Sequence, residues 1–196
     1  MENLPYREII GSLMYDMMIC TKPDIAFAIC FLSQYSNNLG KIHWIALKMI
    51  IRYIKGTLNF CIRYNHNEED IMDYSDVDWA GDLDKRKSTS RFVFIYAEGP
   101  IYWASRKQDC VALSNTEAEY VALSQCTREA IWLQRMKSYL LEEPQKKMII
   151  KGDNQGSLAL ENNPIFHKRT KHIDIQHHFI RSDIEEEKNE IIYCPT

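Results

Sequence analysis

The chain lacks an apolar run long enough to cross a membrane. Its longest run, Ile25 to Leu32, is far shorter than the roughly 20 residues that a membrane-spanning helix needs. No signal-peptide pattern opens the sequence either. We therefore expect no membrane partner and an intracellular location, in a cytoplasmic particle or the nucleus, rather than secretion.

Paired cysteines are also missing. The six cysteines are scattered among apolar residues without a C-x-x-C pair, which argues against a disulfide framework and against a zinc site. The histidines near the C-terminus lack the H-E-x-x-H spacing of a zinc-binding helix. These are His167, His172, His177 and His178.

An excess of positive charge is absent as well. The net charge is −3, whereas proteins that bind nucleic acid through broad electrostatics are usually basic. Any nucleic-acid site must therefore be local. Two clusters, Lys85 to Lys87 and Lys168 to Lys171, provide local positive charge. Solvated loops are the alternative interpretation of both.

What the chain does have is enough apolar residues, 45% of 196, to bury a sizeable core. The pattern changes near residues 66–70. Residues 1–65 predict helices followed by a strand from Phe60 to Tyr64, whereas residues 71–196 alternate strands and helices as an α/β domain does. We place a domain boundary between these two segments.

The second segment begins with a predicted three-strand antiparallel meander, at about 71–79, 92–96 and 101–105. A long helix follows from Ser114, where Ser114 and Glu117 form a capping box. Further predicted elements are a strand at 148–153, helices at 155–161 and 172–187, and a last strand at 191–194.

Three carboxylates lie on separate predicted elements of this segment. Asp76 is in the first strand, Glu119 is on the apolar stripe of the long helix, and Asp153 ends the fourth strand. Divalent metals such as Mg²⁺ take oxygen ligands, and a metal site needs carboxylates that converge from separate elements. The pattern therefore predicts a metal site. The alternatives are an exposed face for Asp76, a buried salt bridge for Glu119 and a helix N-cap for Asp153.

Asp78 shares a strand face with Asp76, because side chains two residues apart point the same way. Two acids on one face repel each other unless a cation joins them. Since Asp78 lies closer to the turn, we expect Asp76 to be the better metal ligand.

Several motifs follow one another in order over the last two thirds of the chain. They are Tyr74 to Asp82, Arg86 to Ser90, Val111 to Tyr120, Asp153 to Gln155 and Arg169 to Asp174. Together they resemble the ribonuclease H region of Ty1/copia-type retrotransposon Pol polyproteins. Residues 1–65, with Gly11 to Tyr15, Lys22 to Asp24 and Arg52 to Thr57, resemble the end of the preceding reverse transcriptase.

The resemblance implies a ribonuclease H-like α/β fold. Its mixed five-stranded sheet would combine the antiparallel meander with parallel strands and be flanked by helices. Residues 1–65 would be a small, mostly helical remnant of the C-terminal region of the reverse transcriptase. Residues 71–196 would be the ribonuclease H-like domain, lacking its final helix.

The implied function is cleavage of the RNA strand of an RNA–DNA hybrid, with two Mg²⁺ or Mn²⁺ ions held by Asp76, Glu119 and Asp153. Asp78 and Asp174 are weaker ligand candidates. The implied partners are the hybrid and the rest of a reverse transcriptase. Hybrid contacts are expected from Lys87, Ser88, Thr89, Arg106, Lys107, Asn154 and Gln155.

Some positions depart from the family pattern. Arg91 stands where the family usually has Gly, Gly152 where Cys is common, and the sequence stops before the helix that carries the family's fourth acid. Two functional classes remain open on these observations. One is a metal-dependent ribonuclease H, and the other is a catalytically dead remnant that only binds nucleic acid or protein.

Overall fold

The computed structural model describes residues 4–19, 22–65, 70–82, 84–142, 144–152, 178–180, 182–183, 186 and 189–194. The chain divides into two compact units, Met1–Arg63 and Tyr64–Thr196. Each is described by itself.

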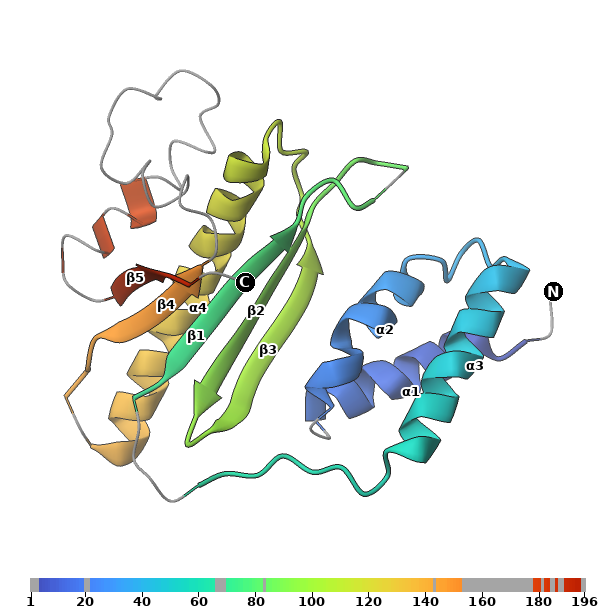
Figure 1. Ribbon diagram of the computed structural model, residues 1–196, viewed down its shortest axis with the longest axis horizontal. Coiled ribbons are helices and arrows are strands. Elements are labelled where there is room, and N and C mark those ends of the chain that lie inside the picture. Colours follow the sequence, from blue (N-terminus) through green and yellow to red (C-terminus); the bar gives the residue numbers. More distant parts are fainter. Residues whose placement is uncertain are drawn as a thin grey trace. The chain divides into compact units, whose positions relative to one another are not determined.

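The first unit is helical. It contains α1 (Tyr6–Ile19), the 3-10 turn η1 (Pro23–Ile25), α2 (Ala26–Ser33) and α3 (Lys41–Gly56) (Figure 1). Pro23 opens η1, where its fixed φ suits the start of a helical segment. The hydroxyl of Tyr6 donates a 2.8 Å hydrogen bond to the carbonyl of Leu32. The buried core of this unit is made of Tyr6, Ile10, Leu13, Ile25, Ile29, Leu32, Leu47 and Ile50.

The strand expected from Phe60 to Tyr64 is wrong. Residues 60–65 adopt no regular secondary structure, and the Phe60 side chain is 69% exposed. Alternating apolar residues form a strand only when another strand supplies their hydrogen bonds. Here the segment makes isolated hydrogen bonds instead, such as the 2.8 Å bond from the Tyr64 hydroxyl to the carbonyl of Pro100.

The second unit is built on a mixed five-stranded sheet. Its strands are β1 (Met72–Asp78), β2 (Thr89–Tyr96), β3 (Gly99–Lys107), β4 (Met148–Gly152) and β5 (Asn189–Tyr193). The order is β3-β2-β1-β4-β5, with an antiparallel meander β1-β2-β3 and parallel pairs β1-β4 and β4-β5 (Figure 1). This confirms the ribonuclease H-like α/β fold that the sequence predicts.

Helix α4 (Asn115–Leu141) packs against one face of this sheet (Figure 1). Alternate residues of β1 point toward it and are buried, whereas Met72, Tyr74, Asp76 and Asp78 are partly exposed on the other face. The main core joins strand residues to the helix stripe. Its buried members are Ile71, Phe92, Phe94, Tyr120, Leu123, Cys126, Ala130, Leu133, Met148, Ile150 and Ile180.

The start of α4 is capped as the sequence predicts. The Ser114 Oγ atom accepts a 3.2 Å hydrogen bond from the Glu117 N–H, and the Glu117 carboxylate accepts a 2.9 Å bond from the Leu113 N–H. In a standard capping box the Glu carboxylate accepts from the N–H of the N-cap residue. Here it accepts from the N–H of Leu113, one residue before the N-cap Ser114, so the N–H groups of Leu113 and Glu117 are both hydrogen-bonded.

We expect Ser114→Ala to lower the free energy of unfolding by about 1 kcal/mol, because the Glu117 N–H loses its acceptor. Denaturant unfolding followed by circular dichroism measures this loss. Asn115→Ala, at the next position, which is also exposed, is the control. An equal loss in both variants would show that the Ser114 cap has no special role.

Candidate functional site

Asp76 and Asp78 lie on the partly exposed face of β1, side by side with Arg91 of β2. Arg91 is the register partner of Asp76 in the antiparallel ladder. Its Nη1 atom lies 3.5 Å from Oδ2 of Asp76, and its Nη2 atom lies 3.2 Å from Oδ2 of Asp78. A cation does join the two acids, as their shared strand face requires, and in this structure it is the Arg91 guanidinium.

The two carboxylates differ in their freedom to bind anything else. The Asp76 side chain is 50% exposed. Asp78 packs against the backbone of Gly81, so closely that a Cβ atom added to Gly81 would collide with the Asp78 carboxylate. Asp76 is therefore the more accessible of the two carboxylates.

Glu119 lies in the first turns of α4 and is 9% exposed. Val77, next to Asp76, forms a small buried cluster with Ala118 and Ala122, which bracket Glu119 on the helix. Asp76 and Glu119 therefore lie near the same end of β1, with the Asp76 side chain on the sheet face opposite α4.

The third predicted ligand, Asp153, lies outside the described residues, as do Asp174, Asn154 and Gln155. The last residue of β4, Gly152, pairs with Ser75, the residue before Asp76. Within the described ranges, no group of three or more His, Cys, Asp or Glu side chains is arranged to hold a metal ion. The convergence of Asp76, Glu119 and Asp153 stays a prediction.

The basic and hydroxyl residues expected to contact a hybrid lie in two regions, the turn between β1 and β2 and the end of β3. Ser88 is fully buried, where its hydroxyl accepts a hydrogen bond from the Ala80 N–H, so it supports the β1–β2 turn. The Lys87 ammonium donates to the carbonyl of Asp109. Thr89 begins β2 and is partly exposed.

Arg106 and Lys107 end β3 and line an open groove beside α4. The other residues that line it are Asp109, Gln125, Arg128, Glu129 and Trp132. Arg106 Nη1 lies 3.3 Å from Oε1 of Glu129. The hydrogen bond and ion pair from Lys107 lower the pKa of the Asp82 carboxyl.

Sequence reasoning did not single out Arg128 of this groove, and it left Trp132 open between a core aromatic and a hybrid-facing one. They are four residues apart on α4, so they share one face of that helix. The Trp132 ring also lies 6.0 Å, centroid to centroid, from the Tyr102 ring of β3. The signal that could have found them is an aromatic and an arginine at helical spacing, on the helix that packs beside the Arg106-Lys107 pair.

A buried acid was also missed. Asp73, on the α4-facing side of β1, is fully buried and accepts a hydrogen bond from the Cys126 thiol of α4. Burial raises the pKa of Asp73 to about 7, although this bond lowers it in part. Its Oδ1 atom is buried without a hydrogen-bond partner among the described residues.

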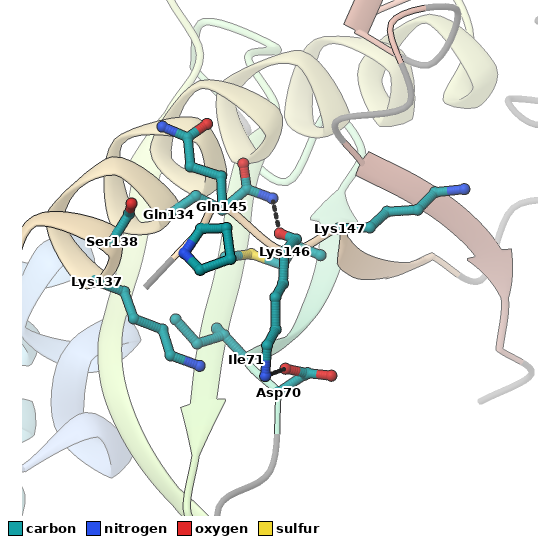
Figure 2. Close-up of a pocket in the computed structure, with 10 residues that line it drawn as sticks. Asp70, Ile71, Gln134, Lys137, Ser138, Gln145, Lys146 and Lys147 are labelled. Atoms are coloured by element: carbon teal, nitrogen blue, oxygen red, sulfur yellow. Dashed lines mark hydrogen bonds and ion pairs between the residues drawn. The ribbon is translucent and has the colours of Figure 1, made fainter. Parts of the chain in front are cut away.

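A small pocket lies at the other end of β1 from Asp76, between α4 and the start of β4 (Figure 2). Its three lysines all have partners. Lys146 lies 3.7 Å from Asp70, Lys147 lies 3.4 Å from Glu190, and Lys137 sits over the Tyr96 ring. This pocket is a packed polar junction of the fold, because its lysines are already engaged by neighbouring side chains.

Known proteins resemble this chain over most of its length, although no protein-family model matches it. A Nicotiana tabacum protein described as "Retrovirus-related Pol polyprotein from transposon TNT 1-94" is 41% identical over 196 residues, which is all of this chain and 15% of that polyprotein. The chain thus spans about one seventh of this relative.

A second relative is short. The "Secreted RxLR effector protein 161" of Plasmopara viticola is 43% identical over 134 residues, which cover 68% of this chain and 94% of that protein.

Among solved structures, the foamy viral protease–reverse transcriptase in complex with an RNA/DNA hybrid matches 97% of this chain and 24% of its own, with a TM-score of 0.55 and 14% identity. At that identity the likeness shows the fold alone. None of the described helices is both long and apolar enough to pass through a bilayer.

Proposed function

Because this chain belongs to the Pol polyproteins of copia-type retrotransposons, we propose that its second unit is a ribonuclease H domain that cleaves the RNA strand of RNA–DNA hybrids. The observation that supports this most is that Val77, next to Asp76 on β1, packs against the residues of α4 on either side of Glu119, so that both acids lie near the same end of β1. The first unit, by the same family relation, corresponds to the end of the reverse transcriptase.

The donor chemistry of this end of the sheet fits a divalent metal. Asp76 and Glu119 offer carboxylate oxygens, the ligands that Mg²⁺ and Mn²⁺ prefer, and the Asp76 side chain is half-exposed beside Arg91. Asp153 would complete the set, because β4 ends beside Ser75. A pair of such ions would supply activation of the attacking water and stabilisation of the leaving 3′ oxygen.

The groove between β3 and α4 suits a nucleic-acid backbone. Arg106 and Arg128 supply positive charge, and the half-exposed Trp132 supplies a face on which a base or sugar can stack. Hybrid recognition by shape and phosphates needs only such a local patch, which agrees with a net charge of −3.

We expect the double variant Arg106→Ala/Arg128→Ala to weaken hybrid binding and to reduce the slope of log affinity against log salt by about 2, one unit for each phosphate that is no longer neutralised. Fluorescence anisotropy of a labelled hybrid at several salt concentrations measures both quantities.

The matched control is Lys137→Ala, which removes a charge from the same helix outside the groove. A control that lowers the slope as much as the double variant does, or binding without any salt dependence, would contradict the groove as the hybrid site.

One observation favours the second candidate function, a catalytically dead binding module. The Asp76 and Asp78 carboxylates are already paired with Arg91.

The intracellular location expected from the sequence also remains a proposal, supported by the relation to transposon polyproteins.

A further inference from the structure

The pairing of β1 with β2 fixes the backbone position of Arg91. It lies inside β2, directly across the ladder from Asp76, with its side chain on the same face as Asp76 and Asp78. The guanidinium reaches both carboxylates at once, at 3.5 Å and 3.2 Å.

The charge at this cluster changes with Arg91. Two carboxylates alone carry two negative charges on one strand face, whereas the guanidinium reduces the net charge to −1. A divalent ion that approaches Asp76 therefore meets less attraction and a nearby positive charge. The three side chains are partly exposed, so the ion pairs are screened by solvent and Arg91 can be displaced.

We propose that Arg91 is an internal counter-ion that competes with divalent metal for Asp76 and so weakens metal binding by this chain. The proposal rests on the proposed function, which places a metal ligand at Asp76. Coulomb's law at the dielectric constant of water gives roughly a tenfold loss of affinity for a divalent ion about 5 Å from a unit positive charge.

Arg91 also gives the acidic pair a partner in the absence of metal. Without a cation, the folded chain keeps Asp76 and Asp78 on one face at the cost of their repulsion. With Arg91, that repulsion is offset whether or not an ion is bound. The Arg91 contact that offsets the repulsion between Asp76 and Asp78 therefore also opposes binding of a metal ion at Asp76.

The test is Mn²⁺ binding to the purified chain, followed by the electron paramagnetic resonance signal of free Mn²⁺. Arg91→Thr removes the charge and keeps a residue that suits a strand. We expect it to bind Mn²⁺ about tenfold more tightly than the unmodified chain, and we expect Arg91→Lys to stay close to the unmodified chain. In Asp76→Asn/Arg91→Thr the gain should disappear.

Two further variants serve as a control and as a replacement. Arg135→Thr removes the same charge from an exposed position on α4, so an equal gain there would overturn the proposal by showing a general charge effect. Arg91→Gln keeps a long side chain that donates hydrogen bonds, and it replaces Arg91→Thr if that variant does not fold.

Equal Mn²⁺ affinity with and without the Arg91 charge would overturn the counter-ion and leave the proposed function intact. A native circular dichroism spectrum without Mn²⁺ binding in any of these proteins would instead contradict the metal site itself, and with it the proposed function.

Discussion

Asp76→Asn is expected to reduce cleavage of an RNA–DNA hybrid by roughly 10²–10³-fold, the size of effect seen when one electrostatic partner of a transition state is removed. Asn keeps the shape of Asp but removes the charge that would hold a divalent ion. Under the proposed function Glu119 is a ligand of the same ions, so Glu119→Gln should have a similar effect. The assay is cleavage of a labelled hybrid in Mg²⁺ and in Mn²⁺.

Asp70→Asn is the control for this experiment. Asp70 is an exposed acid whose partner is Lys146, and it lies before β1, at the opposite end from Asp76. We expect the Asp70→Asn variant to cleave the hybrid at the same rate as the unmodified chain. Full activity in Asp76→Asn would contradict the proposed site, and an unmodified chain that binds hybrid without cutting it would favour the binding-module alternative.

The second large effect concerns stability and pH, through Asp73. Burial raises the pKa of this carboxyl from 3.8 to about 7 in the folded chain. Between these values the folded state holds a proton that the unfolded state has lost, so stability falls as the pH rises. The contribution is fully present below pH 3.8 and is lost as the pH passes about 7, and the difference of about three pKa units corresponds to about 4 kcal/mol.

Asp73→Asn should therefore be more stable than the unmodified chain at pH 8, by about 1–3 kcal/mol after the cost of burying an amide that is not fully hydrogen-bonded. The difference between the two proteins should shrink toward pH 4. Urea unfolding at several pH values measures both curves, and other titrating groups cancel in the comparison. An Asp73→Asn variant with the same pH dependence as the unmodified chain would show that Asp73 is already ionised without cost.

Local signals predicted much of this fold. The alternation of β1, the hydroxyl cap at Ser114 and the apolar stripe around Glu119 are each determined by neighbours within a few residues, and the structure has them in place. The ribonuclease H-like topology came from the resemblance of several motifs taken together, because no local pattern specifies which strands pair.

Contacts between distant residues could not be predicted in the same way. The partner of Asp73 is Cys126, 53 residues away, and Arg91 is 15 residues from Asp76. Gln108 is similar, since its amide bonds to Ser90 and to the carbonyl of Ala118 only because β2, β3 and α4 meet there. The false strand at Phe60 shows the converse error, a local pattern without a distant partner.

The central position of β1 has a consequence for exchange of its amide hydrogens with solvent. β1 is hydrogen-bonded to β2 on one side and to β4 on the other. Its amides can be released only when a neighbouring strand separates, and such openings approach the free energy of global unfolding. The backbone from Met72 to Ser75, which leads directly to Asp76, is paired on both sides and should thus be among the slowest-exchanging parts of the second unit.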